Sequence, residues 1–309
     1  MSRSGWARLR LAGGVAVLAV LLWRLGSGPF VEGLRTVDTT ALLAGVLLAV
    51  PVTICCAYRW TLVARGLRVP LALPTAVAAY YRSQLLNTTL PGGVLGDVHR
   101  AVRHGRDAGH TGRGLRAVGW ERLAGQVVQV AVALVVLVLL PSPVRLSLPV
   151  VVTGVLMLGL LGWVAMSLAG GTRGGRAVHR DVRHGLLGPW LGVVAASLLA
   201  VVGHVATFVV AARTAGVTAP VAVLLPLALL VLVAMGIPAN VAGWGPREGV
   251  AAWVFGAAGL GAGAGVATAV VYGVMVLVAS LPGVVVLLAG RSRARPAEPE
   301  PVLESVSHG

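Results

Sequence analysis

The sequence predicts an all-α polytopic membrane protein, a helical bundle that crosses the bilayer several times. Two observations concern composition: 57% of the residues are hydrophobic and 11% charged, and the mean hydropathy is +0.89, outside the usual range of soluble domains. The third is the presence of continuous apolar runs such as "VVQVAVALVVLVLL". Runs of this kind span about 30 Å of hydrocarbon as helices, whereas strands of a membrane barrel alternate over roughly ten residues.

The net charge of +15 comes from arginine alone, because the chain contains no lysine. Most of the arginines fall in five clusters between apolar runs, at residues 3–10, 59–68, 100–116, 173–183 and 291–295. The positive-inside rule assigns such clusters to the cytoplasm. We therefore expect a protein of the cytoplasmic (inner) membrane with both termini in the cytoplasm. This placement explains the basic charge without a nucleic-acid partner.

Alternation of the clusters predicts six full crossings, at residues 9–25, 39–58, 117–140, 149–169, 187–212 and 264–289. Segments 71–96 and 220–260 each join connections on a single side of the membrane, so both are expected to be re-entrant hairpins. The first would enter from the cytoplasm and turn near Pro91, Gly92 and Gly93. The second would enter from outside and is interrupted by "GIPANVAGWGPREG", residues 236–249.

This order of segments predicts an inverted repeat within a single transmembrane domain, residues 1–290. The half-repeats are about 8–140 and 149–290, and residues 291–309 form a disordered cytoplasmic tail. Inverted halves with interrupted helices are common in transporters, where the interruptions mark the binding site. The alternative is that 220–236 and 248–260 are ordinary short spans and that the symmetry is accidental.

Few charged residues remain once the clusters, the outer connections and the tail are set aside. They are three acids and three arginines: Asp97, Glu121, Glu248, Arg82, Arg122 and Arg247. Because a charge at membrane depth costs several kcal/mol unless it is paired or hydrated, such residues usually line a site. Structural ion pairs, for example Arg82 with Asp97 or Glu121 with Arg247, are the alternative, and both interpretations can hold together.

The segment "GWGPREG" has the signals of a helix start. Gly245 suits the N-cap, Pro246 the first helical position and Glu248 the first turn. A helix start inside the membrane favours an anion, and Arg247 and Arg82 would add bidentate contacts to the same phosphate. The predicted substrate-binding residues are Arg82, Asn87, Gly92, Gly93, Asp97, Arg100, Glu121, Arg122, Asn240, Gly245, Arg247 and Glu248.

Three blocks of sequence resemble the signature regions of the lysylphosphatidylglycerol synthase transmembrane-domain family, also called flippase-like membrane proteins. They are "NTTLPGGVLGDVHR" (87–100), "ERLAG" (121–125) and "IPANVAGWGPREG" (237–249), and the resemblance spans about residues 8–290. In the full-length synthases a soluble aminoacyl-transferase domain follows, and the membrane part is taken to move the lipid. Here only "RPAEPEPVLESVSHG" follows, so the resemblance implies a flippase-like module without that enzyme.

Three functions are compatible with these residues. The first is translocation of an anionic phospholipid or a lipid-linked (polyprenyl-phosphate) glycan. The second is an intramembrane enzyme, with Asp97, Glu121 or Glu248 as general acid or base; no nucleophile or metal-ligand spacing supports it, so we expect no catalytic residue, metal or cofactor. The third is a scaffold for a separate glycosyltransferase or lipid-modifying enzyme. His204, in an apolar run, is either a proton-coupling residue or a structural histidine bonded to nearby backbone.

Overall fold

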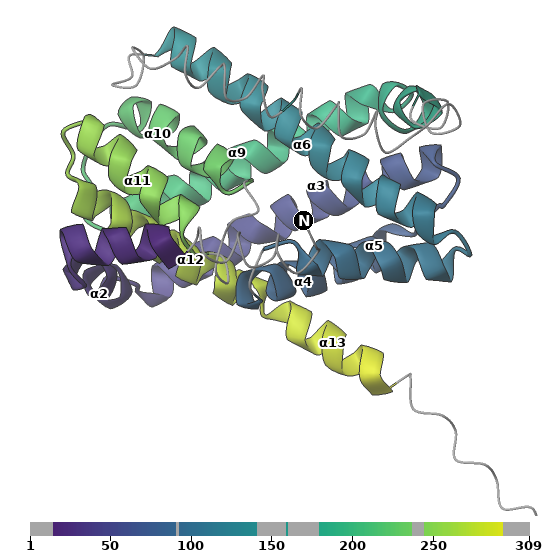
Figure 1. Ribbon diagram of the computed structural model, residues 1–309, viewed down its shortest axis with the longest axis horizontal. Helices are drawn as coiled ribbons and strands as arrows, with labels where there is room; N and C mark the ends of the chain where they lie inside the picture. The colour runs from purple at the N-terminus through teal and green to yellow at the C-terminus, as the bar shows by residue number, and fades with distance from the viewer. Residues whose placement is uncertain (1–14, 91–92, 141–158, 160–178, 237–243, 293–309) are drawn as a thin grey trace, which may run out of the picture.

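The computed structural model describes residues 15–90, 93–140, 159, 179–236 and 244–292, and this part of the chain is all-α (Figure 1). Four helices are long and apolar enough to cross a membrane: Thr39–Gly66 (α3), Thr111–Leu139 (α6), Trp190–Thr214 (α9) and Ala262–Ala289. The last comprises α12 (Ala262–Ser280) and most of α13 (Pro282–Ser292). The chain is therefore a multi-pass membrane protein, and the crossings expected at 39–58, 117–140, 187–212 and 264–289 coincide with these helices.

The first expected crossing, 9–25, is not a simple straight helix in the described residues. A helix over Val15–Leu25 meets α2 (Gly28–Arg35) at an angle of 96°. Gly26 has a φ of 71° and Pro29 stands in the first turn of α2, so the backbone turns sharply and restarts there. If the helix over Val15–Leu25 and α2 are taken together as one bent span, the described residues contain five candidate membrane spans. The crossing expected at 149–169 lies, apart from residue 159, outside the described residues.

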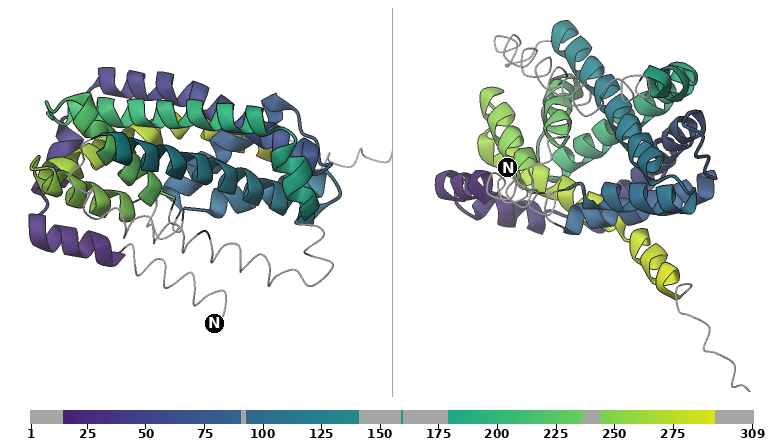
Figure 2. Two further views of the ribbon diagram at one scale, coloured as in Figure 1. Left: turned by 90° about the horizontal axis from the view of Figure 1, so that it is seen from above. Right: turned by 45° about the vertical axis from the view of Figure 1, so that its right-hand side comes forward.

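Helices α3 and α9 pack side by side in antiparallel orientation (Figure 2). Gly192 near the start of α9 lies against Leu62 near the end of α3, and Gly203 lies against Val52. Glycine at these positions lets the two backbones approach closely, as is common between membrane helices. The end of α9 at Thr214 is therefore at the same end of the bundle as the start of α3.

The first interrupted segment is a helical hairpin of α4 (Leu73–Thr89) and α5 (Leu95–Asp107). Helix α4 ends just before Pro91, which disfavours helical backbone in the residue that precedes it, and Gly93 has a φ of 60°. Nε2 of His104 near the end of α5 donates to the Val69 carbonyl oxygen, 3.0 Å away. The hairpin thus begins and ends at one end of the bundle, as predicted, although its second arm continues beyond residue 96 to Asp107.

The second interrupted segment contains α10 (Val221–Ala234) and α11 (Pro246–Ala257). Helix α11 begins at Pro246 with Gly245 as N-cap, as the sequence predicts. At about 1.5 Å per residue, α10 and α11 reach only about 21 Å and 18 Å, too short for a crossing of about 30 Å. Neither helix by itself is therefore long enough for a full crossing.

The two hairpins open toward opposite ends of the bundle (Figures 1 and 2). Helix α10 follows the end of α9, and α11 leads into α12, whose Gly263 lies against Pro29 of α2. Helix α2 in turn precedes the start of α3, whereas α5 ends beside Val69, just past the other end of α3. Since α3 is about 42 Å long at 1.5 Å per residue, the hairpins approach from opposite directions.

Three of the arginine clusters meet at one end of the bundle. Members of the second, third and fourth clusters line one pocket between the end of α3, the start of α6 and a π-helix at Val182–Leu187 (η2). Their shared position agrees with the prediction that these clusters lie on one side of the membrane. Two members do not behave as loop residues: Arg59 and Arg100 are 6% and 1% exposed and lie within α3 and α5.

Candidate functional site

A central cavity of about 240 Å³ lies between α3, α4, α6, α9 and α12. Its wall is apolar on one part and polar on another. The polar lining consists of Thr53, Arg59, Tyr80, Gln84, Asn87, Thr88, Arg122, Gln126, Gln129, Ser197, His204, Thr207 and Tyr272. An apolar pocket with a few convergent polar groups is the usual form of a small-molecule site, and here it lies within a membrane bundle.

Glu121 of α6, beside the cavity, accepts four hydrogen bonds. It is fully buried, and its Oε1 accepts from Arg59 Nε at 2.9 Å, Arg59 Nη2 at 2.5 Å and the Tyr80 hydroxyl at 2.7 Å. Its Oε2 accepts from Arg100 Nη2 at 2.8 Å. Arg59 Nη1 also donates to Ser197 Oγ at 3.0 Å. Glu121 therefore joins α3, α4, α5 and α6, and Arg59 extends the connection to α9.

Asp97 in the first turn of α5 binds a second set of donors. Its Oδ1 accepts from Ser83 Oγ at 3.1 Å and Arg100 Nε at 3.0 Å. Its Oδ2 accepts from Asn87 Nδ2 at 2.9 Å and from Arg122 Nη2. Because the Asn87 side chain also accepts from the Gly96 N–H at 2.8 Å, it fastens the end of α4 to the start of α5.

Arg100 connects the two carboxylates. It bonds both Asp97 and Glu121, and its guanidinium carbon lies 4.7 Å from the Trp60 ring centroid and 4.1 Å from that of Tyr80. At these distances, cation–π attraction adds to the ion pairs in holding the buried charge. Arg100, which the sequence placed both in the third arginine cluster and among the predicted site residues, is therefore the centre of the network.

The five charges alternate in the order Arg59, Glu121, Arg100, Asp97 and Arg122. Three arginines against two carboxylates leave one surplus positive charge. The side chains of Arg59 and Arg100 are 7% and 0% exposed, whereas that of Arg122 is 50% exposed and lines the cavity. The most exposed positive charge of the network is therefore Arg122, which lines the cavity together with the buried Arg59.

The second hairpin contributes a neutral pair. Arg247 donates to Glu248 Oε1 through Nε at 2.8 Å and Nη2 at 2.5 Å, and Glu248 Oε2 accepts from the Gly245 N–H at 2.7 Å. The positive end of α11 is thus covered by its own Glu248. The seat for a ligand anion predicted at this helix start is already occupied by a carboxylate.

Tyr272 of α12 links this pair to the cavity. Its ring centroid lies 5.8 Å from the guanidinium carbon of Arg247, and its hydroxyl lies 3.2 Å from Nδ1 of His204, forming a hydrogen bond. Both Tyr272 and His204 line the cavity. The sequence offered a bond to nearby backbone as one interpretation of His204. In the structure its Nδ1 instead bonds the side chain of Tyr272, on another helix.

The predicted site residues separate into groups. Arg122 and Asn87 line the cavity, with Asp97, Arg100 and Glu121 directly behind them, and Gly93 lies in the hairpin turn. Gly245, Arg247 and Glu248 form the α11 start. Gly92 and Asn240 lie outside the described residues.

Arg82 is apart from the network, so the expected Arg82–Asp97 pair is wrong. Its Nε is buried without a hydrogen-bond partner among the described residues, and the charges that act on it are those of Arg103 and Asp107. The reason is helical geometry: Ser83 and Asn87 share a face of α4 that meets Asp97, and the neighbouring position 82 points about 100° away.

The expected Glu121–Arg247 pair is also wrong, because each residue has a nearer partner: Arg59 and Arg100 for Glu121, and Glu248 for Arg247. A phosphate held jointly by Arg82 and Arg247 is likewise not supported, since neither residue is among those that line the cavity.

Sequence reasoning missed Arg59 and Tyr80. Arg59 was grouped with Arg65 and Arg68 as a loop arginine, although it precedes Arg65 by six residues, or about 9 Å along a helix. That spacing was the available signal that Arg59 lies deeper in the membrane. For Tyr80 no comparable signal existed, because an aromatic residue in an apolar segment is ordinarily a packing residue.

In a comparison with protein families, residues 8–283 fit the model for the lysylphosphatidylglycerol synthase TM region. The match covers nearly the whole chain. The chain belongs to this family. Four residues of the charged network lie in two of the three sequence blocks that resemble the signature regions of the lysylphosphatidylglycerol synthase TM region. They are Asp97, Arg100, Glu121 and Arg122. No curated protein and no solved structure matched.

Proposed function

We propose that this protein translocates an anionic lipid, either a phospholipid or a polyprenyl-phosphate-linked lipid, with the head group passing through the central cavity. The observation that carries the proposal is the half-exposed Arg122 side chain on the cavity wall. Its network has one more positive than negative charge, and an uncompensated charge at membrane depth is costly. A lipid phosphate in the cavity supplies the missing negative charge and accepts bidentate hydrogen bonds from a guanidinium.

The proposed mechanism uses the two hairpins as gates on opposite sides of the cavity. Interrupted helices that approach from opposite ends support an inverted repeat, with halves 8–140 and 149–290, and such repeats alternate access around a fixed site. The first hairpin contributes Asn87 and Thr88 to the cavity wall. The second reaches the wall through the contact between Arg247 and Tyr272. We place the basic end in the cytoplasm and the protein in the inner membrane, from the arginine clusters.

The proposal is tested with purified protein in liposomes. Fluorescent phosphatidylglycerol and phosphatidylcholine are compared by the fraction quenched from outside over time. We expect faster movement of phosphatidylglycerol, and a fall of about 10- to 100-fold in Arg122→Gln, the range for loss of a charged hydrogen bond worth about 1.5–3 kcal/mol. Arg183→Gln removes an exposed arginine that is not among the cavity residues and is the matched control.

Three outcomes would contradict this proposal. Equal movement of both lipids with wild type and Arg122→Gln would remove the role of the cavity charge. A change in the mass of the lipid, measured by mass spectrometry of the same liposomes, would favour the intramembrane enzyme. A scaffold for a separate glycosyltransferase or lipid-modifying enzyme would show no movement until that enzyme is added.

A further inference from the structure

A second pocket, of about 290 Å³, lies at the basic end of the bundle. It is formed by the end of α3, the start of α6 and the π-helix η2, and it shares no lining residue with the central cavity. Its lining is Arg65, Gly66, Leu67, Arg68, Arg113, Arg116, Arg180, Asp181 and His184. Its volume is close to the lower end of the range of roughly 300–1,000 Å³ for small-molecule sites.

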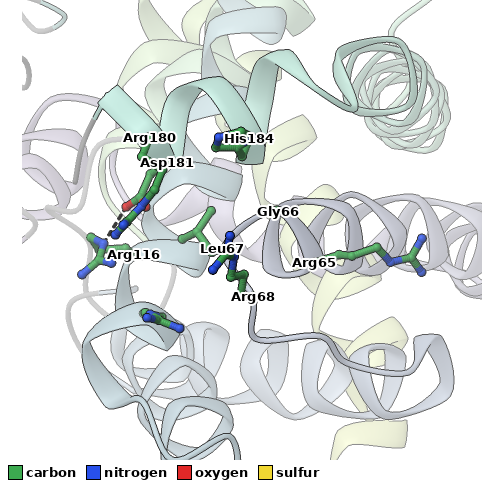
Figure 3. Close-up of a pocket in the computed structure, with 9 residues that line it drawn as sticks. Arg65, Gly66, Leu67, Arg68, Arg116, Arg180, Asp181 and His184 are labelled. Carbon is green, nitrogen blue, oxygen red and sulfur yellow. Dashed lines mark hydrogen bonds and ion pairs between the residues drawn. The ribbon is translucent and has the colours of Figure 1, made fainter. Parts of the chain in front are cut away.

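The pocket has a large surplus of positive charge. The one carboxylate among its described lining residues, Asp181, is 4% exposed and accepts from Arg116 Nε at 2.6 Å. Figure 3 shows Arg180 beside this pair, whereas the Arg65 side chain points away from it. Even without Arg65, four arginines face one acid. Helix α6 also begins here without an acidic residue in its first turn, so its dipole adds positive potential.

Arg68 has a backbone conformation that disfavours its side chain. It is the only non-glycine residue with positive φ, at 59°, in the described part of the chain. It follows the C-cap of α3, where the Val69 N–H donates to the Ala64 carbonyl at 2.9 Å. Helices α5, α9 and α11 end in the same way, and at their equivalent positions the chain has Gly109, Gly216 and Gly259.

Glycine is the usual residue for this type of helix end, because it has no Cβ to oppose the left-handed conformation. An arginine that replaces it incurs backbone strain that three other helices of this chain avoid. Strain of this kind is characteristic of functional positions. The positive-inside rule explains arginines in the connections, but it does not explain an arginine at this particular position.

The end of α3 that precedes Arg68 packs closely against η2. Gly66 lies so close to the backbone of His184 that a Cβ would be 2.2 Å from its carbonyl oxygen, and Gly185 packs against Leu67. The end of α3 is thus fixed to η2. π-Helices of this short kind occur frequently at functional sites.

We propose that this arginine pocket binds a phosphate group, at a site separate from the central cavity. The phosphate belongs either to a lipid head group in the adjacent leaflet or to a soluble phosphate compound. Four arginine side chains, from the turn after α3, the start of α6 and the residues just before η2, provide fork-shaped donors that match the phosphate oxygens. The site is independent of translocation and needs no movement of the hairpins.

The test uses the purified full chain and the variant Arg68→Gly. Inorganic phosphate is titrated calorimetrically at constant ionic strength against chloride. Without phosphate, we expect Arg68→Gly to unfold at a higher temperature than wild type, because the helix end is relieved of strain. With phosphate, we expect about tenfold weaker binding. Arg106→Gln, which removes an exposed arginine outside the pocket, should leave both quantities unchanged.

A second arm identifies the source of the phosphate. Protein from nanodiscs of phosphatidylcholine with or without phosphatidic acid is released into a native mass spectrometer, and retained lipids are counted. Retention of phosphatidic acid that is lost in Arg68→Gly supports a lipid source, and Arg68-dependent binding of inorganic phosphate supports a soluble one. Absence of both kinds of binding in wild type, or an equal loss in Arg106→Gln, would overturn the proposal.

Discussion

Arg100 Nη2 lies 2.8 Å from Glu121 Oε2, and both side chains are 0% exposed. The first hairpin is thus held to α6 by a fully buried ion pair inside a bundle whose other contacts are mainly apolar. In the membrane an apolar surface is as well solvated by lipid as by a neighbouring helix, so polar contacts carry more of the specificity of helix packing. The position of the hairpin therefore depends on a few charged residues.

Glu121→Gln should destabilise the protein strongly. The change leaves Arg59 and Arg100 without their shared carboxylate, and loss of one partner from a buried pair costs about 3–5 kcal/mol. The unfolding midpoint in detergent, followed by circular dichroism, measures the effect. Glu32→Gln, at an exposed position of α2, should have almost none, and similar midpoints for the two variants would contradict the network.

Tyr80→Phe should have a smaller but measurable effect. The hydroxyl donates to Glu121 at 2.7 Å and accepts from Arg100 Nη2 at 3.3 Å, so its removal takes one hydrogen bond from each of two buried charged groups, at about 1–3 kcal/mol. The neighbouring Tyr81→Phe is the matched control in the same unfolding assay. An equal response of both variants would show that the Tyr80 hydroxyl contributes nothing specific.

Arg82→Met should be tolerated. Arg82 is 5% exposed, and its Nε has no hydrogen-bond partner in the described part of the protein. An apolar residue of similar length avoids the desolvation cost, so lipid movement in liposomes should remain close to wild type. If Arg82→Met folds normally but no longer moves the anionic lipid, Arg82 does belong to the binding site, contrary to its position in the structure.

The two cysteines should differ toward charged thiol reagents. Cys56 lines the cavity beside Arg59, and Cys55 does not. Because the cavity wall has a surplus positive charge, an anionic methanethiosulfonate should modify Cys56 in a Cys55→Ser background faster than a cationic one. Cys55 in a Cys56→Ser background should show no such preference, and the reverse order at Cys56 would contradict a positive cavity.

The hairpin arrangement predicts which loops share a side of the membrane. In a protein without Cys55 and Cys56, Pro70→Cys and Arg106→Cys should be labelled from one side of the membrane, and Thr218→Cys from the other. The reagent is membrane-impermeant and is applied to oriented vesicles. Labelling of Pro70→Cys and Arg106→Cys from opposite sides would turn the first hairpin into a crossing and remove the inverted repeat.

Local signals in the sequence were sufficient for the helical elements near the site. Helix α4 ends before Pro91 and α11 begins at Pro246 because proline and glycine restrict the backbone at those residues, whatever surrounds them. The short list of membrane-embedded charges also included three of the five network residues, Asp97, Glu121 and Arg122. The first expected crossing was less accurate, since the turn at Gly26 depends on where α2 packs.

The sequence by itself determined that this chain is a helical membrane protein with two interrupted segments and a few charges in or beside the membrane. Only the tertiary structure decided the partners: Asp97 with Arg122 and not Arg82, Glu121 with Arg59 and Arg100 and not Arg247. The physical reason is that hydropathy and backbone preference act over a few residues. An ion pair between α3 and α6 depends on which helix faces meet, and that is set by the packing of the whole bundle.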